Sequence, residues 1–102
     1  MKNESNDFQK EIDYLKTIAP EKRRIAFLEY CKEKIKLEQN KTISVEGASN
    51  KICNVCSLYS DEIMPEFEEV MNIACDLELP KDFRDRSIED WNKLVKVIEN
   101  KN

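Results

Sequence analysis

The 102-residue sequence contains no histidine and only one glycine, Gly47. Histidine is the side chain that most often serves as a general base or metal ligand near neutral pH, so most acid–base and metal-assisted chemistry lacks its usual residue. A single glycine cannot build a glycine-rich phosphate loop, and it cannot supply the frequent turns of an all-β fold. We therefore expect a protein that binds rather than catalyses, with no cofactor.

Long apolar runs are also missing. The longest uncharged stretch covers residues 52–60, which is too short to span a membrane. The first five residues, Met1 to Ser5, are polar and do not resemble a secretory signal. We predict a cytoplasmic protein in which the four cysteines stay reduced, and a length that fits one domain over residues 1–102.

Apolar residues recur along the chain at spacings of three and four, the period of an α-helix with one buried face. Phe8, Ile12 and Leu15 form such a stripe, as do Ile25, Leu28 and Cys31. Prolines and capping residues divide the chain into helices predicted over residues 6–18, 20–38, 44–59, 65–78 and 88–99. The predicted fold is all-α, an antiparallel bundle of four to five helices with Trp91 in its core.

Basic residues are absent between residues 52 and 80, although the net charge of the whole chain is only −4. All seven charged side chains in this interval, which we call the acidic tract, are carboxylates: Asp61, Glu62, Glu66, Glu68, Glu69, Asp76 and Glu78. Such a run is often a solvated face, and the carboxylates at residues 66–69 also suit a helix start. A concentrated negative face also speeds association with a basic partner protein, whereas it disfavours nucleic acid.

The acidic tract is therefore the predicted partner-binding surface, with two apolar anchors among its carboxylates. The predicted site residues are Tyr59, Asp61, Glu62, Met64, Glu66, Glu69, Asp76 and Glu78.

The four cysteines allow three interpretations. Cys53 and Cys56 form a Cys-x-x-Cys pair that, with Cys31 and Cys75, offers the four thiolates of a structural zinc site. The same pair could act as a redox couple. The spacing is irregular and the pair falls inside a predicted helix, which favours buried thiols that pack as small apolar side chains.

From Phe27 to about residue 95 the sequence resembles a group of small bacterial helical proteins. The resemblance lies in Ile-Ser-Val-Glu-Gly-Ala at residues 43–48, the acidic stretch of residues 76–80 and the late Trp91. Some such proteins resemble immunity proteins of bacterial toxin systems. The resemblance implies an inhibitor that neutralises a basic toxin domain, expected to be a nuclease. A regulatory or adaptor protein of a phage or plasmid, acting on a host protein, is the alternative, and a thiolate zinc module is the third.

Overall fold

The computed structural model describes the backbone of residues 4–77 and 84–101 and the side chains of residues 8–77 and 88–101. This part of the chain is helical and contains no strand, which confirms the all-α prediction. Its elements are α1 (Glu4–Lys16), the 3₁₀ helix η1 (Pro20–Lys22), α2 (Arg23–Gln39), α3 (Val45–Leu58), α4 (Ser60–Ile63), α5 (Glu68–Leu77) and α6 (Arg84–Glu99).

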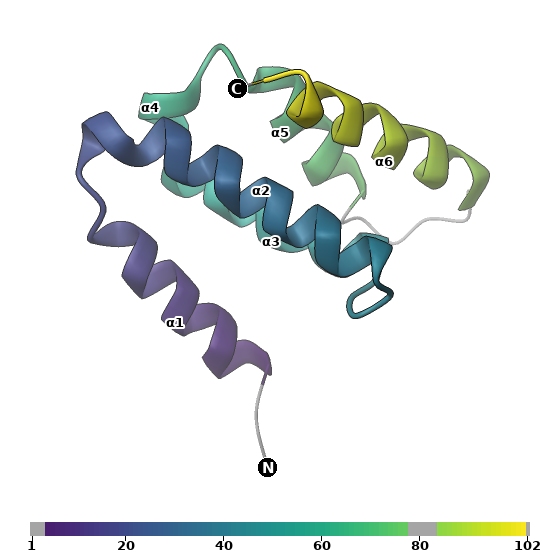
Figure 1. The fold of residues 1–102 in the computed structure, drawn as a ribbon, viewed down its shortest axis with the longest axis horizontal. Coiled ribbons are helices and arrows are strands. Elements are labelled where there is room, and N and C mark those ends of the chain that lie inside the picture. The colour runs from purple at the N-terminus through teal and green to yellow at the C-terminus, as the bar shows by residue number, and fades with distance from the viewer. Residues whose placement is uncertain (1–3, 78–83, 102) are drawn as a thin grey trace.

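Helices α2 and α3 lie against each other in the middle of the molecule, and α5 packs on α3 (Figure 1). Helix α6 covers α5 and also contacts α2. Helix α1 lies at the edge of this bundle, where it touches α3 through a short stretch. The core is therefore built mainly by α2, α3, α5 and α6, and α1 is an arm attached to its side.

Helix α3 begins where the sequence predicts, because Ser44 is its N-cap. The Ser44 side-chain oxygen accepts a hydrogen bond of 3.0 Å from the Gly47 backbone N–H. We expected Gly47 to make room for a neighbouring backbone. Instead, the atom that an added Cβ would meet is Ser44 Oγ, at 3.3 Å. The small residue therefore leaves room for the cap itself.

Two predicted helices differ from those observed. The helix predicted over residues 65–78 begins later: a short helix that was not predicted, α4, ends at Ile63, a turn follows through Pro65, and α5 begins at Glu68. The last helix begins at Arg84 rather than residue 88, so Ser87 lies inside it and is not its cap.

On α2, Leu28 and Cys31 are buried as predicted, but the buried face does not include Ile25 and extends to Phe27 instead. Ile25 is 58% exposed, whereas Phe27 is completely buried. The reason lies in the tertiary contacts, because the Phe27 ring meets the edge of the Phe67 ring at a centroid distance of 5.0 Å. Trp91 is buried as predicted, and its indole N–H donates to Glu38 Oε1 at 2.9 Å.

Tyr59 joins the arm to the bundle at the end of α3. Its side chain is fully buried, and its hydroxyl donates a hydrogen bond to the backbone carbonyl of Leu15, just before the end of α1. The Arg23 guanidinium lies 5.2 Å from the centre of the Tyr59 ring. Burial raises the pKa of the Tyr59 hydroxyl, so it stays a proton donor at neutral pH.

We predict that Tyr59→Phe lowers the free energy of unfolding by about 1–2 kcal/mol, because it removes a buried hydrogen bond and leaves the Leu15 carbonyl with only the Ile18 N–H at 3.3 Å. Urea unfolding measures this change. Tyr14→Phe is the matched control, since Tyr14 is 67% exposed and its loss of a hydroxyl should change stability by less than about 0.5 kcal/mol. Equal effects of the two substitutions would contradict the role given to Tyr59.

Candidate functional site

The structure does not leave the acidic tract as a free negative face. Glu66 accepts two hydrogen bonds of 2.6 Å from the Arg24 guanidinium, and Lys101 Nζ lies 3.7 Å from the same carboxylate. These hydrogen bonds and charges lower the pKa of Glu66. Glu62 pairs with Arg23 at 3.4 Å. Basic residues from the start of α2 and the chain end therefore neutralise two of the predicted binding carboxylates.

The remaining predicted site residues are dispersed. Tyr59 is fully buried, which corrects its prediction as a surface anchor, and Met64 is half-buried against the core. Asp61 and Glu69 are exposed on α4 and α5, while Asp76 is half-buried. Glu78 lies outside the described residues. Of the seven predicted residues that the structure describes, one is therefore buried and two are already paired with arginine side chains.

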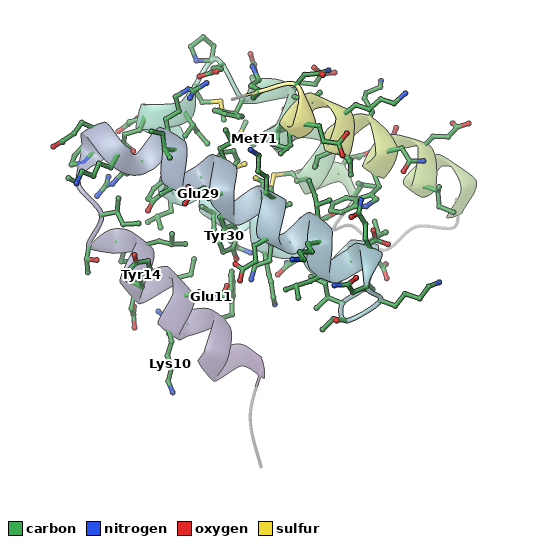
Figure 2. All side chains as sticks on the ribbon, in the orientation of Figure 1. Lys10, Glu11, Tyr14, Glu29, Tyr30 and Met71 are labelled. Carbon is green, nitrogen blue, oxygen red and sulfur yellow. A yellow bond between two sulfur atoms is a disulfide. The ribbon has the colours of Figure 1, made fainter. Side chains whose placement is uncertain are left out.

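A different surface has the shape of a binding site. An open groove with a volume of about 560 Å³ runs between α1 and α2, within the size range of ligand-binding clefts. Figure 2 labels Glu11 and Tyr14 on one wall and Glu29 and Tyr30 on the other. The residues that line this α1–α2 groove are Glu11, Tyr14, Leu15, Ile18, Ala26, Glu29, Tyr30 and Glu33.

The groove combines an apolar floor with an acidic rim. Half-buried Ile18 and Ala26 supply apolar surface between the two helices, and Leu15 lies nearly buried at the bottom of the groove. Glu29 and Glu33 are exposed on α2, one helical turn apart. Exposed Tyr14 adds a large aromatic side chain to the α1 wall. Apolar area with a few placed charges is the composition of a surface that binds another molecule.

Glu11 holds the two walls together at one end of the groove. Its carboxylate accepts hydrogen bonds of 2.9 Å from the Tyr30 hydroxyl and 2.9 Å from Lys34 Nζ. Lys34 is only 2% exposed, and its ammonium also lies 4.7 Å from the centre of the Tyr30 ring. Burial, followed by the Glu11 charge, raises the pKa of Tyr30, so its hydroxyl remains protonated.

No local pattern in the sequence indicates the cluster of Glu11, Tyr30 and Lys34. Lys34 stands among the other charged residues of α2, and Glu11 precedes it by 23 positions. Only the crossing of α1 over α2 brings the two side chains together. The groove was missed for the same reason, although the exposure of Tyr14 could be predicted from its position off the apolar stripe of α1.

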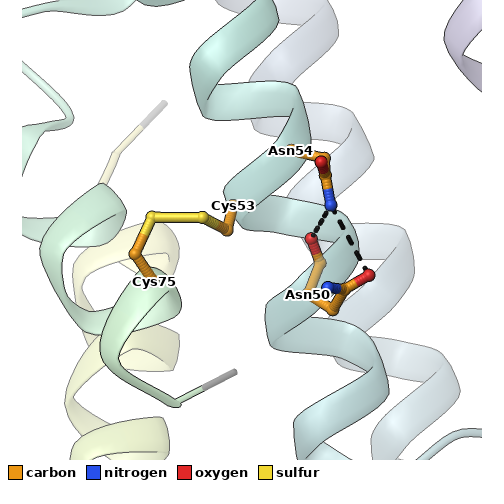
Figure 3. Close-up of a disulfide and its surroundings, with 4 residues drawn as sticks. All are labelled: Asn50, Cys53, Asn54 and Cys75. Atoms are coloured by element: carbon orange, nitrogen blue, oxygen red, sulfur yellow. Dashed lines mark hydrogen bonds between the residues drawn. A yellow bond between two sulfur atoms is a disulfide. The ribbon is translucent and has the colours of Figure 1, made fainter. Parts of the chain in front are cut away.

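A disulfide links α3 to α5 on another side of the bundle. Cys53 and Cys75 are bonded with a Cα–Cα distance of 5.2 Å, within the usual range for this bond (Figure 3). This corrects the prediction that all four cysteines are reduced. The sequence could not pair them because Cys75 is 22 positions beyond Cys53 and the nearer Cys56 offered an equally plausible partner.

The other two cysteines, Cys31 and Cys56, are buried thiols. Burial raises the pKa of Cys56 to about 12 and that of Cys31 well above its usual value, so neither is a reactive thiolate near neutral pH. The disulfide occupies two of the four thiols that a zinc site would need. The zinc alternative would therefore require this bond to be reduced.

Comparison with protein-family models, curated proteins and solved structures gives no match to this chain. Within the described ranges, no helix is both long and apolar enough to cross a membrane.

We predict that denatured, unreduced protein contains two titratable thiols per chain. Reduction of the disulfide should lower the free energy of unfolding by roughly 3 kcal/mol, because the cross-link restricts the unfolded chain. Thiol titration and urea unfolding test this. Cys53→Ser/Cys75→Ser should make stability independent of reductant. Four thiols in the unreduced chain would contradict the disulfide.

Glu11→Gln is expected to destabilise the protein by about 1–2 kcal/mol, because it leaves the buried Lys34 ammonium without its close carboxylate. The expected loss is kept small because Glu11 is partly exposed and water screens the ion pair. Hydrogen exchange should speed up in α1 and stay unchanged in α3. Glu33→Gln is the matched control, since Glu33 is 64% exposed and 3.8 Å from the same ammonium. Similar exchange in both variants would show that Glu11 does not hold α1.

Proposed function

We propose that this protein is a non-enzymatic inhibitor of the immunity type, which binds a basic partner protein and covers the surface that the partner needs for its activity. The observation that carries the proposal is the α1–α2 groove, with its apolar floor and the exposed Glu29 and Glu33 on its rim. Burial of the floor would supply binding free energy. The carboxylates would speed association and select a basic partner.

The groove supports this function better than the acidic tract does. Glu29 has no ion pair among the described residues, whereas Glu62 and Glu66 are already paired with Arg23 and Arg24. A partner that used Glu66 would have to replace two short hydrogen bonds from a guanidinium, and such bidentate contacts are among the stronger ones in proteins. The exposed Asp61 and Glu69 would then contribute mainly long-range attraction.

The resemblance to immunity proteins of toxin systems supports a toxin domain, with nucleases first, as the partner class. A regulatory or adaptor protein that binds a host protein is the second candidate, and the same groove would serve it. We place either activity in the cytoplasm. This placement requires the packing of α3 on α5 to keep the bundle folded where the Cys53–Cys75 bond is reduced.

The proposal predicts tight binding, with a dissociation constant on the order of nanomolar, to a basic toxin domain encoded by the adjacent gene. Raising the salt concentration from about 0.05 M to 0.5 M should weaken this binding by roughly tenfold or more, because charge attraction is screened. Calorimetric titration measures both values, and inhibition of the partner's activity should follow the same salt dependence. An adjacent gene product that is basic but shows no binding at low salt would reject the inhibitor function. Tight binding without inhibition would favour the adaptor.

A further inference from the structure

We infer that the α1–α2 groove receives an amphipathic α-helix of the partner protein, with one apolar face flanked by Lys or Arg residues spaced one turn apart. This inference rests on the proposed function and names the element of the partner that is bound. The helical shape and the basic residues of this partner element are both inferred from the residues that line the groove.

The walls of the groove are themselves helical, and their lining residues recur at helical spacing. Leu15 comes from α1 and Ile18 from the bend that follows it, and Ala26 and Tyr30 are one turn apart on α2. The lining residues of α2 run from Ala26 to Glu33, which is about 10 Å of helix and enough to accompany about two turns of a guest helix. Helices dock into such grooves through apolar anchors at positions i, i+3 or i+4 and i+7.

The charges on the rim have the spacing of a helical guest. Glu29 and Glu33 are four residues apart on the exposed side of α2, so their side chains are neighbours separated by one turn. Glu11 is different, because its carboxylate is already shared by Lys34 and Tyr30. Two basic residues one turn apart on the guest would therefore face Glu29 and Glu33 and leave Glu11 in place.

An extended segment fits this site less well than a helix. The described residues contain no strand, so there is no sheet edge to pair with the backbone of an extended peptide. Over the apolar floor, the backbone N–H and C=O groups of such a peptide would lose water without gaining partners. A helix satisfies these groups internally and presents only side chains to Leu15, Ile18 and Ala26.

A second copy of this chain is also a poor occupant. A two-fold symmetric contact brings the same patch of both molecules together. If both copies used the groove, the exposed pair Glu29 and Glu33 would face the same pair on the other molecule. Like charges brought together in this way oppose association, whereas a basic helix neutralises them.

The test uses a designed peptide of about sixteen residues, with leucines at helical spacing and lysines on both flanks of that face. Its control is a peptide of identical composition whose order breaks the apolar face. Fluorescence anisotropy is measured with the wild-type protein, with Glu29→Lys/Glu33→Lys and with Glu68→Lys/Glu69→Lys. The last variant makes the same change in charge on exposed residues of α5, outside the groove. Circular dichroism establishes that both variants are folded.

We expect the amphipathic peptide to bind the wild-type protein at least tenfold more tightly than the control peptide. Glu29→Lys/Glu33→Lys should weaken binding at least tenfold, while Glu68→Lys/Glu69→Lys should change it less than threefold. Amide NMR shifts on binding should be largest at Tyr14, Ala26 and Glu29. Ala26→Trp, which fills the floor without changing charge, should also reduce binding at least tenfold.

Equal binding of both peptides would overturn the inference, because charge alone would then explain the affinity. An equal or larger loss of peptide affinity in Glu68→Lys/Glu69→Lys would also overturn it. The same holds if the peptide does not bind at all, or if sedimentation shows a dimer that the peptide cannot dissociate. None of these results bears on whether the basic partner binds. If the partner binds but Glu29→Lys/Glu33→Lys leaves its affinity unchanged, the groove is rejected and the inhibitor function stands.

Discussion

The hydrogen-bonded cluster of Glu11, Tyr30 and Lys34 sets the distance between α1 and the bundle. At this point α1 meets α2 through a carboxylate, a hydroxyl and a buried ammonium rather than through interlocking apolar side chains. The other end of the arm is fixed by polar groups as well: the Tyr59 hydroxyl binds the Leu15 carbonyl, and Arg23 donates to the Ile18 carbonyl at 2.8 Å. Contacts at both ends leave the apolar surface between them open as the α1–α2 groove.

The helices of the bundle beside the groove are held together by packing, a disulfide and an ion pair. They therefore form a rigid support for α1 and for a bound partner. Helix α3 packs on α5 and is also bonded to it by the Cys53–Cys75 disulfide. The Arg24–Glu66 ion pair ties the start of α2 to the segment just before α5, close to the edge-to-face contact of Phe27 and Phe67. Charges that would make the acidic tract a binding face therefore hold the bundle together instead.

Local signals in the sequence were sufficient for the parts of the fold that depend on local chemistry. The helical periods, the Ser44 cap, the burial of Trp91 and the exposure of Tyr14 agree with the structure. The errors arise where distant residues decide the outcome. Phe27 is turned inward by Phe67, and Glu66 is neutralised by Arg24, 42 positions away. The order of charges along the sequence locates the carboxylates, but it does not show which basic side chains lie beside them in the folded protein.

The central claim is that polar contacts fix α1 beside α2 without apolar packing that would fill the space between them, so that the groove is open in the unbound protein. The most direct measurement is NMR signal loss caused by a soluble paramagnetic probe. The account predicts strong loss for the ring of Tyr14 and the methyl groups of Ile18 and Ala26, and little for the buried indole of Trp91. Protection of Ile18 and Ala26 comparable to that of Trp91 would mean that α1 closes onto α2, and it would contradict the account.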